Sequence, residues 1–223
     1  MSEESTTVAS EGIEKLANLQ TKETDEELAK KSVTDRSAFD ELINRYEQKL
    51  RRYVSRMILS SPNKDEDEID DILQDTFIKT YKNIADFDTS LSFSSWIYRI
   101  ARNETISVLR KHKRFFFFER ESKDTDDGEI FGTDHLEYFN VPPNQAEDFD
   151  ESINKEQIKK VLSFMDQKYR DILVLRYFEE KDYTEISDIL KKPPGTVATL
   201  LRRAKVQFEK ISKEKSKLHT ISI

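Results

Sequence analysis

The stretch Phe93-Ser-Ser-Trp96-Ile-Tyr-Arg99-Ile-Ala-Arg102-Asn103-Glu-Thr-Ile106 has the spacing of an amphipathic helix with two chemically different faces. Apolar residues recur three or four positions apart on one face, which carries Phe93, Trp96, Ile97, Ile100, Ala101 and Val108. The opposite face carries Arg99, Arg102, Asn103 and Arg110. A helix that buries an aromatic-rich side and exposes Arg and Asn can hold a nucleic-acid backbone and read a base. The same pattern also fits an ordinary solvated helix face, so the segment alone leaves both interpretations open.

The composition predicts an all-α protein. Charged residues make up 36% of the 223 residues and hydrophobic residues another 36%, with only four glycines and five prolines. Turn-rich runs of alternating β-branched residues, which are typical of sheets, are missing. No apolar run approaches the roughly 18 residues that a membrane span needs, and the N-terminus lacks the pattern of a secretory signal. We therefore expect a soluble, cytoplasmic protein.

The residue types needed for most catalytic or metal sites are absent or scattered. The chain has no cysteine, which excludes disulfides, thiolate metal ligands and thiol nucleophiles. Its three histidines, His112, His135 and His219, are far apart in the sequence, and neither a metal-ligand spacing nor a nucleophile–base pair accompanies them. The sequence therefore predicts a protein that is not an enzyme and that uses no metal or cofactor.

The charge is distributed unevenly along the chain. A formal net charge of −7 argues against a protein that coats DNA through bulk electrostatics. Basic clusters nevertheless lie at Arg110–Arg114 and Arg202–Lys205, whereas much of the acidity lies between residues 119 and 151. Local basic faces therefore remain candidates for DNA contact.

Helical periodicity divides the chain into two small helical domains joined by an acidic flexible linker. We expect a mobile acidic N-terminal extension at 1–32, a first domain at 33–115, the linker at 116–150, a second domain at 151–215 and a tail at 216–223. In the first domain, apolar spacing predicts helices near 39–58, from about Asp67 to Ile84, and from Phe93 to about Arg114. A structureless segment as long as 116–150 is unusual inside one domain and indicates a tether between two.

The second domain has the order of a helix-turn-helix. Asp182, followed three residues later by Glu185, predicts the capped start of a short helix. The turn Lys191-Lys-Pro-Pro-Gly195 leads into a last helix that buries Val197, Leu201, Ala204, Phe208 and Ile211. The N-terminus of that helix would point N–H groups at phosphates, and Thr196, Thr199, Arg202 and Arg203 would supply side-chain donors. An ordinary helical hairpin with a basic face is the alternative.

Two sets of motifs carry a resemblance to a known family. Tyr169-Arg-Asp-Ile-Leu-Val-Leu-Arg176-Tyr-Phe178, Tyr183-Thr-Glu-Ile186, Gly195-Thr-Val197 and Arg203-Ala-Lys205 resemble domain four of bacterial RNA polymerase sigma factors. Asp70-Asp-Ile-Leu-Gln74-Asp75-Thr-Phe77-Ile-Lys-Thr-Tyr81 and the stretch that begins at Phe93 resemble domain two. A chain with only these two domains, joined by an acidic linker, resembles the extracytoplasmic-function (ECF) subfamily. The match covers about residues 33–115 and 151–210.

The resemblance implies a transcription initiation factor and assigns its surfaces. Expected partners are the clamp and flap regions of core RNA polymerase, promoter DNA at −35 and −10, and an anti-sigma factor. The implied polymerase-binding residues are Asp71, Gln74, Asp75, Phe77 and Tyr81. The implied −10 residues are Phe87, Ser92, Trp96, Arg99, Arg102, Asn103, Arg110 and Lys113. The implied −35 residues are Thr196, Ala198, Thr199, Arg202, Arg203 and Lys205.

Within the −10 set, the residue types favour different roles. Asn103 has the amide that can read a base extruded from the non-template strand, and the arginines can hold phosphates. Trp96 lies on the core face of its helix, so packing is its expected main role. The acidic linker resembles the segment that threads the polymerase cleft in this family, where its charge would mimic RNA.

Departures from the family pattern keep other functions open. Ala198 and Leu200 stand where recognition helices often carry polar or basic residues, and Lys191 stands where a glycine commonly ends the preceding helix. One alternative is a helix-turn-helix regulator that acts without polymerase, although the net acidity disfavours it. Another is an interaction module whose DNA-binding face has lapsed.

Overall fold

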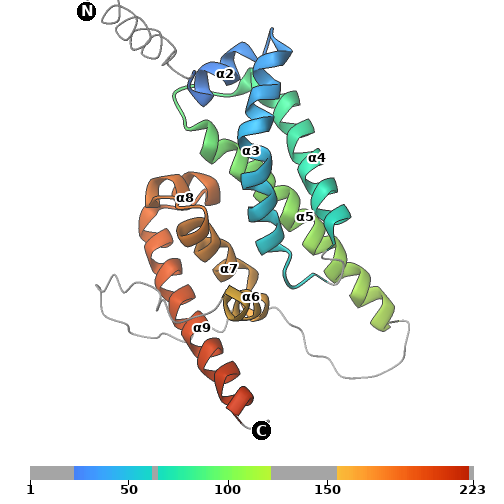
Figure 1. Ribbon diagram of the computed structural model, residues 1–223, viewed down its shortest axis with the longest axis vertical. Coiled ribbons are helices and arrows are strands. Elements are labelled where there is room, and N and C mark those ends of the chain that lie inside the picture. Colours follow the sequence, from blue (N-terminus) through green and yellow to red (C-terminus); the bar gives the residue numbers. More distant parts are fainter. Residues whose placement is uncertain (1–22, 62–64, 122–154, 221–223) are drawn as a thin grey trace, which may run out of the picture.

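The computed structural model describes residues 23–61, 65–121 and 155–220, and throughout these ranges the regular structure is helical (Figure 1). The predicted all-α class is confirmed. The N-terminal module contains α2 (Asp25–Lys31), α3 (Arg36–Met57), α4 (Glu66–Asn83), the short 3₁₀ turn η1 (Ile84–Asp86) and α5 (Phe93–Glu121). The C-terminal module contains α6 (Lys155–Phe164), α7 (Gln167–Leu173), the π-helical turn η2 (Val174–Phe178), α8 (Tyr183–Leu190) and α9 (Pro194–Thr220).

The N-terminal module packs α3, α4 and α5 around one apolar core. Asp35 accepts a hydrogen bond from the Ser37 N–H at the start of α3, and Asp65 accepts one from Glu68 N–H at the start of α4. The inward faces of the three helices are almost fully buried and include Leu42, Tyr46, Leu50, Tyr53, Ile69, Ile72, Leu73, Phe93, Ile97 and Ala101. Spacing of these residues at three and four positions explains why the helices form a bundle.

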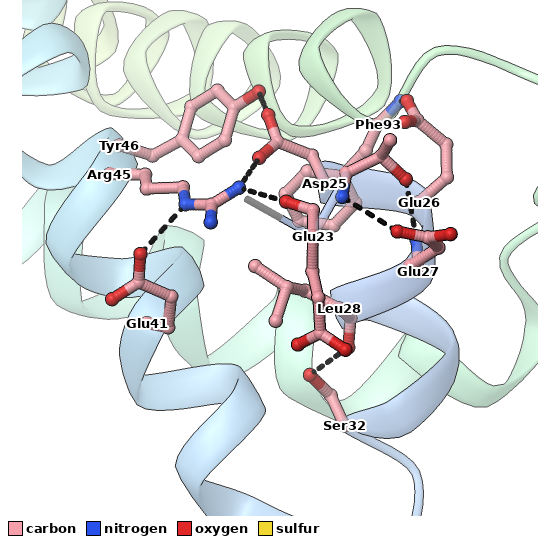
Figure 2. A network of polar contacts seen from close by, with 11 residues as sticks. Glu23, Asp25, Glu26, Glu27, Leu28, Ser32, Glu41, Arg45, Tyr46 and Phe93 are labelled. Atoms are coloured by element: carbon pink, nitrogen blue, oxygen red, sulfur yellow. Dashed lines mark hydrogen bonds and ion pairs between the residues drawn. The ribbon is translucent and has the colours of Figure 1, made fainter. Parts of the chain in front are cut away.

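The folded N-terminal module begins earlier than the expected boundary at residue 33, because α2 packs against it. Leu28 and Ala29 of α2 are buried in the core, and Thr24 caps this helix in a box with Glu27. Figure 2 shows Asp25 accepting hydrogen bonds from the Tyr46 hydroxyl, at 2.5 Å, and from an Arg45 nitrogen, at 2.7 Å. The rest of the expected extension, residues 1–22, lies outside the described residues.

Two other predicted boundaries fall short of the observed helices. Helix α5 continues to Glu121, past the expected domain end at 115, because no proline or glycine interrupts the chain before Gly128. Helix α9 continues to Thr220, beyond the expected end at 215, in a segment that also has no helix breaker. The remainder of the expected linker lies within 122–154, outside the described residues.

The C-terminal module is built around a central apolar segment, as its sequence predicts. Residues 172–175 of α7 and η2 are at most 1% exposed; α9 packs against α7, α8 contacts η2, and α6 packs against α9. Asp182 and Glu185 form the expected capping box at the start of α8. Lys191 ends that helix in the left-handed region at φ 51°, and Pro194 opens α9. These two signals set the geometry of the helix-turn-helix.

The two modules lie against each other, as Figure 1 shows for α5 of the N-terminal module and α7 and α8 of the C-terminal module. Helix α8 contacts α5, and η2 contacts α3. Because of this contact, a predicted site residue of α5, Arg102, faces the C-terminal module and not open solvent.

Candidate nucleic-acid and polymerase interfaces

Helix α5 presents three faces rather than the two that its sequence predicts. The buried face repeats every four residues, with Phe93, Ile97, Ala101 and Thr105 at no more than 1% exposure. A second face turns to the C-terminal module, where the Tyr98 hydroxyl donates to Glu179 at 2.6 Å and Arg102 Nε donates to Asp171. The third face carries Trp96, Ile100 and Asn103 beside a surface cavity.

That cavity is the place where a base could be held. Its volume is about 360 Å³, and its lining is Lys79, Asn83, Asp86, Trp96, Ile100, Asn103 and Glu104. Asn103 is exposed, so its amide is available to a ligand as donor and acceptor. Trp96 is half-buried, and its ring lies 4.9 Å from the Phe87 ring and 5.7 Å from the Phe93 ring. The indole therefore both packs and lines the cavity.

The other predicted −10 residues do not line the cavity. Phe87 is 8% exposed beneath Trp96, and Ser92 accepts a hydrogen bond from Ser95 N–H, which caps the start of α5. Arg99 is half-buried and Arg110 is exposed further along the helix. Arg102 is bound to the other module. Lys113 lies in α5, but its side chain is outside the described residues.

Sequence reasoning missed several cavity residues. Asn83 comes from the end of α4, and Lys79 of α4 forms an ion pair with Glu104 of α5 across the cavity edge. Asp86, in η1 before α5, lies in the loop that the family resemblance also assigns to a base pocket, and it does line the cavity. No local pattern pairs Lys79 with Glu104, because they are 25 residues apart.

Four of the five predicted polymerase-binding residues lie on the exposed side of α4, and two of the five line a groove beside it. Asp71, Gln74 and Asp75 are exposed on one face. Phe77 and Tyr81, at the edge of that face, line a groove of about 380 Å³ between α3 and α4, whose other lining residues are Arg36, Phe39, Asp40, Ile43, Ile78 and Lys82. The Tyr81 ring meets the Phe39 ring edge-on at 5.0 Å and stays 51% exposed. Ile78, 41% exposed, was missed, although its spacing from Gln74 and Asp75 places it on the same face.

The predicted −35 residues are likewise divided. Thr196, Ala198 and Arg203 are exposed on the first turns of α9. The Thr199 hydroxyl donates to the Gly195 carbonyl at 3.0 Å, which leaves its oxygen as an acceptor. Arg202 is half-buried, and Lys205 Nζ lies 5.5 Å from the centre of the Tyr177 ring. The helix-turn-helix therefore exposes three of the six side chains fully, and only two of those three are polar.

Two buried carboxylates of the C-terminal module were not anticipated as interface residues. Asp171 is 1% exposed and accepts hydrogen bonds from the Tyr53 hydroxyl, at 2.8 Å, and from Arg102. Burial raises the pKa of Asp171, and the Arg102 charge opposes that rise. Glu179 accepts from Tyr98 and from Arg56 Nη1, at 2.9 Å, and burial raises its pKa as well.

Arg170 is a buried cation whose partners are mainly carbonyl oxygens. It is 1% exposed and donates to the carbonyls of Leu162 and Met165 at the end of α6, at 2.7 and 2.9 Å. Nη1 donates to the carbonyl of Met57, the last residue of α3, at 2.8 Å. Burial lowers the pKa of Arg170 to about 10, so the group stays charged at neutral pH. One guanidinium thus satisfies the C-terminal carbonyls of helices from both modules.

Comparison with known proteins assigns the modules to a family. The model for Sigma-70 region 2 matches residues 42–115, and the model for Sigma-70, region 4 matches residues 155–208. The ECF RNA polymerase sigma factor SigW of Bacillus subtilis (strain 168) is 35% identical over 182 residues, which cover 79% of this chain and 89% of that protein. The ECF RNA polymerase sigma-E factor of Haemophilus influenzae is 30% identical over 182 residues, which cover 78% of this chain and 87% of that protein.

Solved structures share the fold. The structure of CnrH in complex with the cytosolic domain of CnrY has a TM-score of 0.58 and 20% identity, covering 86% of this chain and 99% of CnrH. The structure of RpoE in complex with the anti-sigma factor NepR from Bartonella quintana has a TM-score of 0.55 and 22% identity. The match covers 78% of this chain and 96% of RpoE.

The chain belongs to the ECF family of RNA polymerase sigma factors. It is therefore a transcription initiation factor and not an enzyme: it binds core RNA polymerase and directs promoter-specific initiation at −35 and −10 DNA. None of the helices in the described part of the chain is long and apolar enough to cross a membrane.

Proposed function

We propose that the cavity beside α5 holds a base of the −10 element and that Asn103 reads its edge. The single observation that carries this proposal is that Trp96 and Asn103 line one cavity, the indole as an aromatic wall and the amide as donor and acceptor. Extruding a base costs a few kcal/mol, and stacking with edge hydrogen bonds can return that energy. In this proposal helices α2 to α5 form the −10 module and helices α6 to α9 form the −35 module.

The polymerase clamp docks on α4 in this proposal. Asp71, Gln74 and Asp75 would meet basic partner residues and steer association, because exposed acids act at long range. Tyr81 and Ile78 would supply the apolar anchor beside them, since they are among the large hydrophobic side chains that stay exposed.

The −35 element is bound mainly through its backbone in this proposal. Thr196 and Arg203 are the exposed polar side chains of the predicted set at the start of α9, and Ala198 offers no hydrogen bond. Backbone N–H groups at the helix start and DNA shape would then carry much of the recognition. An anti-sigma factor in the cytoplasm is the proposed regulator, by analogy with the complexes of CnrH and RpoE.

The test is the exchange Asn103→Ala, compared with Asn44→Ala as a matched control on the exposed side of α3. A promoter is first identified by sequencing transcripts that core polymerase makes with this protein on genomic DNA. Permanganate footprinting should then show open complexes reduced by about tenfold, because one base-edge contact is worth about 1–3 kcal/mol. Core binding should be unchanged. Equal melting by Asn103→Ala and the wild type would refute the assignment.

A further inference from the structure

We propose that helix α2 is a positioning element for the cavity beside α5, and that Glu26 is the residue through which it acts. Glu26 holds the first turn of α5, and with it Trp96, in the orientation that a base in the cavity needs. This role rests on the proposed function of the cavity, but the position of Trp96 can be measured without DNA.

The start of α5 takes its negative charge from another helix. The first turn of α5 contains no acidic residue of its own, and Ser92 Oγ accepts only the Ser95 N–H there, at 3.2 Å. The Phe93 N–H donates instead to a carboxylate oxygen of Glu26 in α2, at 2.9 Å (Figure 2). The first N–H groups of a helix lack partners within the helix, and a carboxylate beside them also favours the positive end of the helix dipole. Glu26 therefore completes the cap of α5 from outside.

The neighbouring residue of α2 supports the same place through an aromatic ring. Asp25 accepts a hydrogen bond from the Tyr46 hydroxyl of α3 and pairs with Arg45 at 2.7 Å (Figure 2). The Tyr46 ring meets the Phe93 ring edge-on, with 5.5 Å between their centres. Both of these aromatic side chains are at most 2% exposed. Adjacent carboxylates of α2 thus hold Phe93 from two directions, through the ring of Tyr46 and through its own backbone N–H.

The aromatic contacts continue from Phe93 to the wall of the cavity. The ring of Trp96, one turn further along α5, lies 5.7 Å from the Phe93 ring and 4.9 Å from the Phe87 ring. Phe87 follows η1, which contacts α2 and supplies Asp86 to the cavity lining. Close-packed rings transmit a displacement to one another, so a shift at the start of α5 moves the indole. Helix α2 therefore sets the shape of the cavity, although none of its residues lines it.

Helix α2 divides into an apolar anchor and a polar contact, which makes its positioning role separable from its contribution to folding. Leu28 and Ala29 anchor the helix in the core and are at most 3% exposed. Glu26 is half-buried and does not belong to that anchor. The exchange Glu26→Ala removes the acceptor for the Phe93 N–H, whereas Glu26→Gln keeps a carbonyl oxygen that can accept it. The two variants together isolate the hydrogen bond.

The fluorescence of Trp96 tests the contact in the free full-length protein, because this is the only tryptophan of the chain. Glu26→Ala should raise the acrylamide quenching constant about twofold, since the loosened first turn of α5 exposes the indole. Glu26→Gln should restore the wild-type value. Asp35→Ala is the matched control, because it removes a carboxylate that caps α3 and has no contact with α5. Wild-type quenching in Glu26→Ala, or equally raised quenching in Asp35→Ala, would overturn the proposal.

Permanganate footprinting with core polymerase then measures the effect on the promoter, at a temperature where circular dichroism shows every variant folded. Glu26→Ala should reduce open complexes about fivefold, because it removes one charge-assisted hydrogen bond that orients the cavity wall. Glu26→Gln and Asp35→Ala should melt the promoter as the wild type does. Equal melting by Glu26→Ala and Asp35→Ala would contradict the positioning role.

Failure of this proposal is distinguishable from failure of the base assignment. If Asn103→Ala melts the promoter normally, the base assignment fails, whereas raised quenching in Glu26→Ala still supports the hold of α2 on Trp96. If Asn103→Ala prevents melting and Glu26→Ala leaves the quenching constant unchanged, the base assignment stands and the positioning role of Glu26 is refuted.

Discussion

Arg102 and Asn103 are adjacent in α5, yet they belong to different surfaces: Arg102 donates to Asp171 of the C-terminal module, whereas Asn103 lines the cavity with Trp96. Successive residues of an α-helix are separated by about 100°, which allows one helix to serve two partners. The helix that reads the −10 element in our proposal is therefore also the helix on which the C-terminal module docks.

Arg170 should be a major determinant of stability. Its replacement by Met would leave carbonyls at the ends of α3 and α6 buried without their donor. We expect the free energy of unfolding to fall by about 3 kcal/mol or more, because several buried acceptors lose their partner together. Urea denaturation measures the change. Lys168→Met, an exposed position on the same helix, should stay within about 0.5 kcal/mol of the wild type, and a similar value for Arg170→Met would contradict the prediction.

Lys191 should be replaceable by glycine with a gain in stability. Its φ of 51° is in the left-handed region, where a side chain is strained and glycine is not. We expect Lys191→Gly to raise the free energy of unfolding by about 0.5–1 kcal/mol, again by urea denaturation. Lys192→Gly is the matched control, because Lys192 has no positive φ and should gain nothing. A loss of stability in Lys191→Gly would show that its side chain stabilises the turn.

Gly195 should separate stability from DNA binding. A Cβ at this position would meet no other atom within 4 Å, so the fold does not require glycine there. Gly195→Ala should therefore leave the free energy of unfolding unchanged or raise it by up to about 1 kcal/mol. If phosphate approaches the start of α9, the added methyl should weaken the polymerase–promoter complex by about tenfold in gel-shift titrations. Unchanged promoter affinity would move the phosphate site away from this helix start.

The periodic parts of the fold were predictable because they depend on local spacing. The inward faces of α3, α4 and α5 and the capping box at Asp182 follow from residues within a few positions of one another. The contact between the N-terminal and C-terminal modules was not predictable in the same way. Tyr53 and Asp171 are 118 residues apart, and Arg102 and Asp171 are 69 apart, so no sequence period links them.

Long-range contacts also account for the site residues whose surroundings the sequence did not predict. Asn103 was a candidate because it is a polar residue on a helix with an aromatic face. In the structure it lines the cavity together with Trp96. Arg102 has the same local signal, but its direction depends on a partner carboxylate from the other module. The contacts of α2 likewise join residues that are far apart in the sequence. Glu26, for example, accepts a hydrogen bond from the Phe93 N–H at 2.9 Å (Figure 2).

Tyr81 should contribute to polymerase affinity more than to folding. Because 51% of it is exposed, Tyr81→Ser should change the free energy of unfolding little. If the groove between α3 and α4 meets the clamp, loss of the ring should weaken core binding by about 2 kcal/mol in fluorescence anisotropy titrations. Val206→Ser on α9 is a control with a comparably exposed apolar side chain, at 45%. Equal core affinity of the two variants would remove the groove from the polymerase interface.

The pH dependence of stability should carry the signature of Asp171. Burial raises its pKa above the ordinary 3.8, although Arg102 and Tyr53 favour the charged form. The folded protein therefore keeps a proton on this group at pH values where the unfolded chain has lost it. As pH rises from about 4 through the raised pKa, the contribution of Asp171 to the free energy of unfolding falls, and it is constant above that window.

The variant Asp171→Asn isolates this effect, because asparagine keeps the shape and cannot titrate. Groups with lowered pKa, such as Asp35 and Asp88, change stability in the opposite direction in both proteins and cancel in the comparison. Glu179 also cancels, because both proteins retain it with Tyr98 and Arg56. Urea denaturation between pH 4 and pH 8 should show the wild type losing stability relative to Asp171→Asn as pH rises through the acid range. Parallel profiles would mean that Asp171 titrates in the folded protein as it does in the unfolded chain, and that its burial between the modules has no net electrostatic cost.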